Sequence, residues 1–528
     1  MRLLKVESGG NFSLVQLERD KMQPYAVLSH VWGETDQELT FKDIMDKTGK
    51  QKAGYEKIDF CAKQAEEDKI QYIWVDTCCI DKSSSAELSE AINSMYHWYE
   101  NATKCYAYLS DVSYPERTSR GQGTPVDFPT SRWFERGWTL QELIAPQDVV
   151  FYSKEWRLIG TKSTLARDLQ KITGIDGRVL EGAHPSLCSV ADRMSWAAKR
   201  KTTREEDVAY SLLGMFDVNM PLLYGERGKA FIRLQEEIMK ASDDQSVFAW
   251  TSSDSNFYAG LLATSPEYFD TSRSITSPGY SNGSEPSVMT SRGIRATFDL
   301  EWKYFEDGTH FARLACHRAE DSHQYAILLQ HIQGYQYIRI SPSILEAFDP
   351  QKQNVFSFPT IRKTVYVRQN LFSPLQLSRF PRSTNGRNDI RWFWFRSTGD
   401  LRLSELVASA VSLPDIALFG LGMQQTGTVL ITYGASEDQK MSIHFGIHDN
   451  HPFCRLEDFD DVTEDISSWV ESGLGMNDHR PIRKREGGAM ANRAAYGEST
   501  TFMTARASQV KIRSFWCTVI TLCLKTVG

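Results

Sequence analysis

The sequence predicts an α/β fold with a parallel sheet, followed by a β-rich antiparallel domain. Between residues 25 and 152, short and nearly continuous apolar runs alternate with amphipathic segments of helical period. Such apolar runs are typical of parallel strands covered on both faces. After Trp250, apolar runs follow one another between turns rich in Gly, Ser and Pro, as in antiparallel sheets. A chain of 528 residues exceeds one compact core, so we expect domains at 1–250 and 251–455 and an irregular, flexible tail at 456–528.

The first domain is expected to alternate strands and helices in chain order. The predicted strands span residues 25–33, 72–76, 105–109 and 149–152, and the predicted helices between them span 55–69, 86–100 and 133–145. In the first of these helices the apolar residues recur at helical spacing on one face, as a helix packed on a sheet requires. Residues 153–250 are predicted to be mostly helical and are interpreted as a cover for the sheet.

The second domain is expected to be built from strands. Its predicted strands span residues 294–300, 311–316, 325–329, 337–340 and 364–367. The sequence leaves two roles open for this second domain. The first is a role in recognition or regulation, and the second is that of a packing platform for the first domain. In the tail, the apolar stretch 515–524 is about ten residues long, short of the ~20 that a membrane-spanning helix needs. No membrane span is therefore predicted, and no function is assigned to the tail.

Composition limits the classes of function. The net charge of −7 argues against nucleic acid as a partner. The nine cysteines are scattered and contain no C-x-x-C pair, so the sequence predicts neither a metal site nor a disulfide framework. The N-terminus becomes charged too soon for a signal peptide. We therefore expect a cytoplasmic protein that requires no cofactor.

Polar residues follow the first two predicted strands where each of them ends. Ser29, Trp32 and Gly33 lie at or after the end of the first strand, and Asp76 and Asp81 follow the second. Ligands of open parallel sheets bind outside the carboxyl ends of the strands, so these residues form a candidate site. The alternative is that Ser29 and Asp76 only cap the turns that follow them.

The stretch from Trp133 to Pro146 supplies a candidate catalytic group. Trp138 and Glu142 are four residues apart, which places them on the same face of a helix. A carboxylate beside a large apolar ring is partly desolvated, and this raises its pKa and suits it to acid, base or charge-stabilising work. The alternative is that the apolar residues are core and that Glu142 is solvated or paired with a neighbour such as Arg136.

Three blocks of the chain resemble the signature blocks of the fungal heterokaryon-incompatibility (HET) domain. They read Y-A-V-L-S-H-V-W-G (25–33), Y-I-W-V-D-T-C-C-I-D-K (72–82) and R-G-W-T-L-Q-E-L-I-A-P (136–146). The resemblance continues in family order to about residue 250, with small departures at Lys82 and Arg227. It implies a role in vegetative incompatibility, in which fusion of unlike fungal individuals triggers cell death. The region after Trp250 resembles the β-rich companion that follows many HET domains.

The HET domain is in turn similar to TIR domains, and this similarity implies a flavodoxin/TIR-like sheet and a chemistry. Glu142 matches the glutamate that cleaves the nicotinamide–ribose bond of NAD in catalytically active TIR domains, and Trp138 matches the tryptophan four residues before it. Ser29 and Gly33 fall in the loop that borders the nucleotide pocket. Cleavage leaves an oxocarbenium-like sugar, which a carboxylate stabilises. On this interpretation Glu142 is catalytic, Ser29, Trp32, Gly33, Asp76, Asp81 and Trp138 bind NAD, and NAD is a substrate.

Two functions therefore stay open. In the first, the domain is an NAD⁺ nucleosidase centred on Glu142. In the second, it is a non-catalytic signalling module that assembles through its surface and causes death through protein partners. Both imply self-association and an upstream sensor protein. An open pocket between Glu142 and the loop 29–33 favours the first, and a Lys or Arg filling that pocket favours the second.

Overall fold

The computed structural model describes the chain outside residues 8–10, 19–20, 115–123, 254–257, 278–284, 305–308, 321–322, 350–359, 370–390, 399–400, 407–410, 414–415, 422–425, 434–439, 449–450, 459–493, 497–498, 513–514 and 528. The chain divides into two compact units, Met1–Arg382 and Ser383–Gly528. The predicted boundary at residue 250 therefore lies inside the first unit. Within the part of the chain that the structure describes, no helix is long and apolar enough to cross a membrane.

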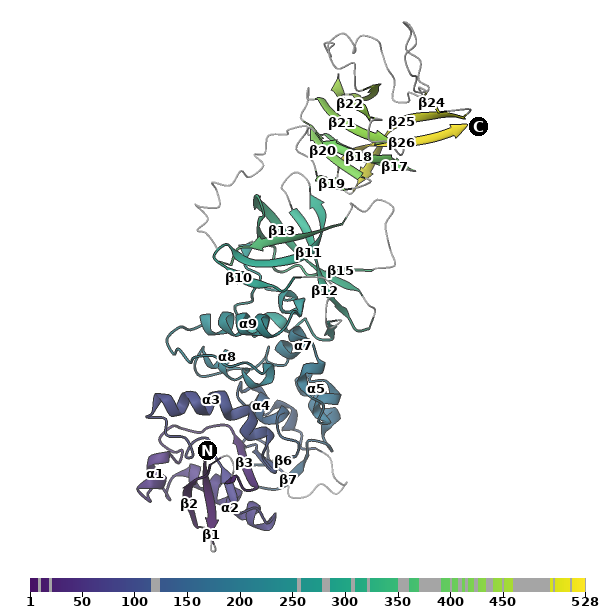
Figure 1. The fold of residues 1–528 in the computed structure, drawn as a ribbon. Coiled ribbons are helices and arrows are strands. Elements are labelled where there is room, and N and C mark those ends of the chain that lie inside the picture. Colours follow the sequence, from purple (N-terminus) through teal and green to yellow (C-terminus); the bar gives the residue numbers. More distant parts are fainter. Residues whose placement is uncertain are drawn as a thin grey trace. The chain divides into compact units, whose positions relative to one another are not determined.

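The first unit opens with a mixed seven-stranded sheet (Figure 1). Its strands are β1 (Arg2–Glu7), β2 (Asn11–Gln16), β3 (Tyr25–His30), β4 (Tyr72–Trp74), β5 (Lys104–Tyr108), β6 (Val149–Tyr152) and β7 (Leu158–Thr161), in the order β2-β1-β4-β3-β5-β6-β7. The four predicted strands β3 to β6 are mutually parallel in the order β4-β3-β5-β6. The hairpin of β1 and β2 and the strand β7 add antiparallel edges that were not predicted.

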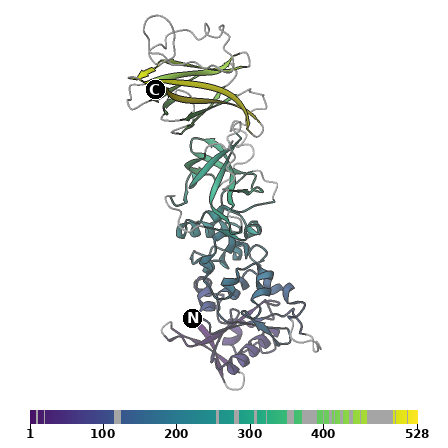
Figure 2. The ribbon, with the colours of Figure 1, turned by 90° about the vertical axis from the view of Figure 1, so that its right-hand side faces the viewer.

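Helices accompany this sheet and continue after it. They are α1 (Phe41–Met45), α2 (Ala53–Glu67), α3 (Ser85–Glu100), α4 (Thr139–Ile144), α5 (Ala166–Thr173), α6 (Gly177–Leu180), α7 (Val190–Ser195), α8 (Asp207–Tyr210) and α9 (Lys229–Ala241), with short 3₁₀ turns between them. In both views the N-terminal helices lie next to the strands (Figures 1 and 2). The predicted face of α2 is its buried face, with Ile58, Cys61, Ala62 and Ala65 in the core. The N-terminal part is therefore α/β with a mostly parallel sheet.

The segment predicted as one helix over 133–145 is broken in two. A 3₁₀ turn, η3 (Arg132–Glu135), is followed by Arg136 in an extended conformation, and α4 begins only at Thr139. The cause is a short bridge to a distant segment, in which Lys201 N donates to Glu135 O and Gly137 N donates to Lys201 O. A Cβ at Gly137 would lie 2.4 Å from the Thr202 side chain, so only glycine admits this approach.

The β-rich region begins within the first unit. Its sheet contains β8 (Tyr258–Ala259), β9 (Ile275–Thr276), β10 (Val288–Thr290), β11 (Gly293–Tyr304), β12 (Thr309–Arg318), β13 (Gln324–Gln333), β14 (Gln336–Ile340), β15 (Glu346–Phe348) and β16 (Ile361–Val367). The order β11-β16-β14-β13-β12 closes on itself through a further β11–β12 pairing. One pair, β14–β16, is parallel, which corrects the purely antiparallel expectation. The long connection between these two strands supplies the crossover that a parallel pair needs.

The second unit is also made of strands where it is described. One sheet has the order β19-β20-β17-β26-β25-β24 and the other has the order β18-β21-β22-β23. Their bounds are β17 (Arg391–Thr398), β18 (Leu401–Leu406), β19 (Val411–Leu413), β20 (Ile416–Leu421), β21 (Thr426–Tyr433), β22 (Lys440–His448), β23 (His451–Asp458), β24 (Ala494–Tyr496), β25 (Ser499–Ile512) and β26 (Phe515–Val527). Strands β24 to β26 thus occupy part of the stretch expected to be an irregular tail, and residues 459–493 lie outside the described residues.

Candidate functional site

Ser29 and Glu142 meet at the carboxyl end of β3. The Ser29 hydroxyl donates to Glu142 Oε2 at 2.5 Å, although the two residues are 113 positions apart in the chain. The indole N–H of Trp133 donates to Ser29 Oγ at 2.9 Å. Because Ser29 Oγ accepts from Trp133, its own hydrogen is free for the carboxylate. The side chains of Trp133, Ser29 and Glu142 thus form a chain of two hydrogen bonds, and all three are buried.

The Glu142 carboxyl is held in an apolar environment. Burial raises its pKa from the ordinary 4.5 to about 8, while hydrogen bonds from Ser29 and Tyr99 and the charge of Arg136 oppose that rise. Among the described residues, no Lys, Arg or His nitrogen lies within 4.0 Å of this carboxylate. The expected alternative of an ion pair with Arg136 is therefore not what the structure shows. A carboxyl with such a pKa can accept or release a proton near neutral pH.

Trp32 and Asp76 form a second contact at the same edge of the sheet. Trp32 is 37% exposed, and its indole N–H donates to Asp76 Oδ2 at 2.9 Å. The ammonium of Lys82 lies 3.7 Å from the centre of the Trp32 ring, and the Arg136 guanidinium lies 5.2 Å from it. Asp76 also raises the pKa of Glu142 through its charge. This edge therefore holds an exposed ring with two cations on it, close to the buried carboxyl.

Gly33 and His30 lie beside an ion pair between Glu38 and Lys57. Gly33 N donates to Glu38 Oε1 at 2.6 Å, and the Lys57 ammonium donates to the same oxygen at 2.5 Å. His30 is fully inside the protein, and its pKa is lowered by burial first and then by the charges of Lys57, Arg136 and Lys82. Nε2 of this neutral ring has no hydrogen-bond partner among the described atoms. The loop after β3 is thus anchored by Glu38.

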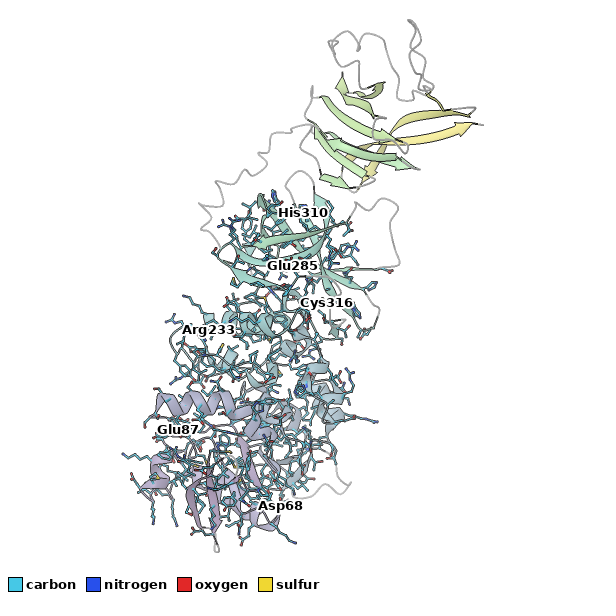
Figure 3. The ribbon with its side chains drawn as sticks, viewed as in Figure 1. Asp68, Glu87, Arg233, Glu285, His310 and Cys316 are labelled. Carbon is cyan, nitrogen blue, oxygen red and sulfur yellow. The ribbon has the colours of Figure 1, made fainter. Side chains whose placement is uncertain are left out.

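The hydrogen bonds of Asp81 and Trp138 go to residues other than Ser29 and Glu142. The Asp81 carboxylate accepts from Ser83 N and Ser83 Oγ, at 3.0 and 2.6 Å, and Asp81 N donates to Glu87 (labelled in Figure 3) at 2.9 Å. These bonds are those of a capped turn before α3. The Trp138 indole N–H points to Asp207 of α8, at 3.4 Å. The indole that contacts the Ser29–Glu142 pair directly is that of Trp133.

Residues 25–122 match the family model described as "Heterokaryon incompatibility protein (HET)". This chain carries a HET domain. The matched residues include Ser29, Trp32, Gly33, Asp76 and Asp81, whereas Trp138 and Glu142 lie after them.

A curated relative matches more of the chain. Over 243 residues the chain is 51% identical to "Vegetative incompatibility protein HET-E-1" of Podospora anserina. This match covers 46% of the chain but only 18% of the relative, so the chain spans about a fifth of that protein's length. Residues 229–274 match a further family model described as "Domain of unknown function (DUF8212)", and no solved structure matches.

Sequence reasoning missed some of the groups around Glu142. The Arg200 guanidinium donates to Arg136 O at 2.8 Å and to Thr139 Oγ1 at 2.9 Å, and it feels the charge of Glu142. Its Nη2 is buried and has no hydrogen-bond partner among the described atoms. Nothing in its local sequence indicates this position. Trp133, by contrast, lies in the stretch Trp133–Pro146 that was identified from the sequence. The sequence resemblance assigned the indole of Trp138 to the site, whereas the structure places the indole of Trp133 there.

Proposed function

We propose that this chain acts in vegetative incompatibility, the response that triggers death when unlike fungal individuals fuse. The HET domain and the 51% identity to a vegetative incompatibility protein support this role. Because the chain spans only a small part of that relative, its trigger and partners are proposals as well. They are an upstream sensor protein and self-association of this chain in the cytoplasm.

We further propose that the HET domain is TIR-like and cleaves NAD at the Ser29–Glu142 pair. The observation that carries this proposal is the hydrogen bond between Ser29 on β3 and Glu142 on α4. The parallel strand order β4-β3-β5-β6 supports it, because it runs second-first-third-fourth in chain order, as in flavodoxin-like sheets. In such sheets the ligand crevice lies between the first and third strands, and these are β3 and β5 here.

The proposed reaction needs one carboxylate and a water molecule. The bond between the nicotinamide nitrogen and the ribose C1 breaks, and its electron pair leaves with the nicotinamide. Water adds to C1, gives its proton to Glu142, and the proton then passes to solvent. This step uses the ionised form of Glu142, which a pKa of about 8 makes the minor form at neutral pH. The ionised carboxylate also stabilises the oxocarbenium-like sugar in the transition state. Trp32, Gly33 and Asp76 follow the carboxyl ends of β3 and β4, so we assign them to binding, whereas Asp81 and Trp138 are assigned to it only through the resemblance.

The test is NAD turnover by the full chain, clustered through an inducible dimeriser, beside Glu142→Gln. The substitution keeps the size of the side chain and removes its charge, so nicotinamide release is expected to fall by at least about 100-fold. Glu66→Gln is the matched control, because Glu66 is an exposed acid on α2. Equal release by the Glu142→Gln variant and the wild type would rule out Glu142 as the catalytic group.

A second candidate function is favoured by one observation. The cations of Lys82 and Arg136 already lie on the Trp32 ring beside Asp76, and Glu142 is covered by Ser29. A site closed in this way fits a non-catalytic module that causes death through protein partners. This alternative predicts that the clustered wild-type chain releases no nicotinamide and that Glu142→Gln still supports cell death in a fungal expression assay.

A further inference from the structure

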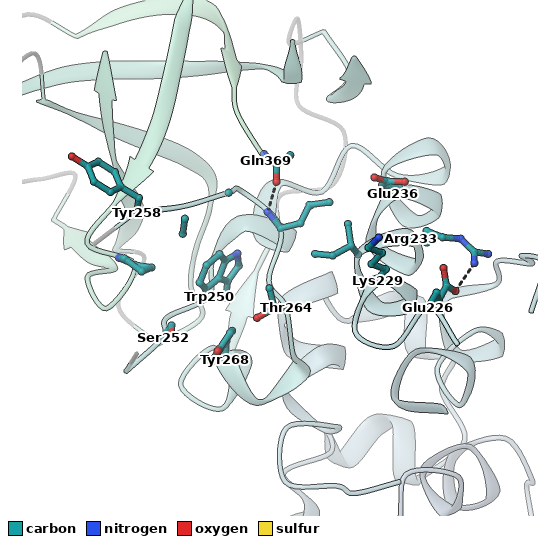
Figure 4. Close-up of a pocket in the computed structure, with 15 residues that line it drawn as sticks. Glu226, Lys229, Arg233, Glu236, Trp250, Ser252, Tyr258, Thr264, Tyr268 and Gln369 are labelled. Carbon is teal, nitrogen blue, oxygen red and sulfur yellow. Dashed lines mark hydrogen bonds and ion pairs between the residues drawn. The ribbon is translucent and has the colours of Figure 1, made fainter. Parts of the chain in front are cut away.

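A cavity of about 450 Å³ lies between α9 and the β-rich region of the first unit (Figure 4). It shares no residue with the Ser29–Glu142 site. Its lining consists of Glu226, Lys229, Ile232, Arg233, Glu236, Trp250, Ser252, Tyr258, Ala259, Gly260, Leu262, Thr264, Tyr268, Pro342 and Gln369. All of these except Glu226, Pro342 and Gln369 fall within the segment 229–274 that matches the domain of unknown function. The volume falls within the range of small-molecule sites, ~300–1,000 Å³.

One wall of the cavity is a face of α9. Lys229, Ile232, Arg233 and Glu236 stand three, four and seven positions apart, so they share one side of the helix. Figure 4 shows Lys229, Arg233 and Glu236 on this helix, opposite the aromatic side chains. This wall therefore carries nearly all of the charged groups of the cavity.

The opposite wall is aromatic and rigid. Trp250 stacks on Tyr268 with ring centres 5.7 Å apart, and the Arg339 guanidinium lies 3.8 Å from the Trp250 ring. Trp250 is thus covered by its neighbours and only 3% exposed. The Tyr258 ring points away from α9 in Figure 4 and packs against the apolar cluster around Phe311 and Ile340. The half-buried ring of Tyr268 is therefore the aromatic surface that a ligand would meet.

Gln369 holds the loop of this aromatic wall in place. Its Oε1 accepts from Leu262 N at 3.1 Å, and its Nε2 donates to Val367 O at 3.0 Å. A Cβ at Gly260 would lie 2.5 Å from Gln369 Oε1, so glycine allows this close approach. The wall is formed before any ligand arrives.

On the cavity face of α9, one cation has no acidic partner among the described residues. Arg233 is neutralised by Glu226 at 2.5 Å and also donates to Pro221 O. Partial burial raises the pKa of Glu236. Lys229 is exposed, and no acidic oxygen of the described residues lies within 4.0 Å of its ammonium. Lys229 is therefore the cation that an anionic ligand would pair with.

We propose that this cavity binds a small planar aromatic molecule that carries one anionic group. The ring packs against Tyr268, and the anion pairs with Lys229. Such a ligand contacts both α9 and the β-rich region, and its binding stabilises the first unit by an amount that rises with the logarithm of its concentration above Kd. The cavity thereby gives the segment 229–274 a ligand-sensing role that does not depend on NAD cleavage.

The test compares 2-naphthoate with its neutral isostere 2-naphthamide on the full chain, by isothermal titration calorimetry. We expect 2-naphthoate to bind about threefold more tightly, the difference that one exposed ion pair gives. Lys229→Gln is expected to remove this preference. Lys240→Gln is the matched control, because Lys240 lies on the same helix but pairs with Glu237 outside the cavity.

A second variant blocks the cavity. Thr264→Trp places a large ring in the space that exposed Thr264 lines, so both naphthalenes are expected to lose binding while thermal unfolding shows an intact fold. The proposal is overturned if neither compound binds the wild type at millimolar concentration. It is equally overturned if both compounds bind the Lys229→Gln and Thr264→Trp variants as they bind the wild type.

Discussion

Glu142 shows how a single residue acquires its properties from distant parts of the chain. Its neighbours in space are Ser29 on β3, Tyr99 on α3 and, through charge alone, Asp76 after β4. Burial dominates the sum of these effects and raises its pKa to about 8. The carboxyl is therefore mostly protonated at neutral pH, whereas in the unfolded chain it ionises near 4.5.

This shift makes a prediction about stability. In the folded state the Glu142 carboxyl keeps its proton up to about pH 8, whereas in the unfolded state the same carboxyl loses its proton near pH 4.5. Stability should therefore fall progressively between pH 4.5 and 8, by an amount on the order of several kcal/mol for this one group. Glu142→Gln removes this contribution. Thermal unfolding of both proteins from about pH 5 to about pH 8.5 should show that the stability of the variant rises relative to that of the wild type as pH increases. Parallel pH profiles of the two proteins would contradict the prediction.

At the scale of elements, close contacts decide where helices begin and how they pack. The break before α4 follows from the bridge between Arg136 and Lys201, and a comparable constraint joins α3 to η5 (Gly214–Phe216). A Cβ added to Gly214 would lie 2.0 Å from Tyr96 Cβ, and Tyr96 is buried. The two elements can approach this closely only because Gly214 has no side chain.

Gly214→Ala should therefore destabilise the protein. Neither the buried Tyr96 nor the backbone can move away without loss of packing, and overpacking of this kind costs about 1–3 kcal/mol. Gly228→Ala is the control, because Gly228 has a helical φ of −56° and nothing lies within 4 Å of the position that its Cβ would take. Urea unfolding should give a lower midpoint for Gly214→Ala alone. An equal midpoint for both variants would show that α3 and η5 can move apart to admit the extra Cβ without a measurable loss of folding free energy.

At the scale of the whole molecule, the first unit is joined across a buried arginine. Arg339 of β14 is 0% exposed, and its guanidinium donates to Phe248 O at 3.0 Å and to Trp250 O at 2.5 Å. Burial lowers its pKa to about 9. These bonds connect the nine-stranded sheet to the segment that ends the helical region, and both lie in the compact unit Met1–Arg382.

Arg339→Leu should loosen this junction. The change leaves two buried carbonyls without a donor, at a cost of about 1–3 kcal/mol each, partly offset by removal of a buried charge. Arg339→Lys keeps one donor and should lose less stability. The unfolding temperature measures both, with Arg362→Leu on the exposed part of β16 as the control. No difference between Arg339→Leu and the Arg362 control would contradict this account.

The sequence by itself determined the parts that depend on local pattern. The strands β3 to β6, the helices α2 and α3 and the helical character of residues 153–250 were predictable, because apolar period and length are local properties. The strands β11 to β14 and β16 followed for the same reason. Ser29 and Glu142 were singled out from strand ends and motif resemblance, and their roles stay predictions, as do those of Trp32, Gly33, Asp76, Asp81 and Trp138.

Only the tertiary structure decided which of these residues meet. The indole at the Ser29–Glu142 pair is that of Trp133, because the bridge to Lys201 divides the predicted helix. The closed ring of strands likewise depends on long-range pairs such as Ile294 and Val367, and the cavity beside α9 depends on Leu262 and Gln369, which are 107 positions apart. Long-range pairing and burial set these contacts and the pKa of Glu142, and neither leaves a local signal in the sequence.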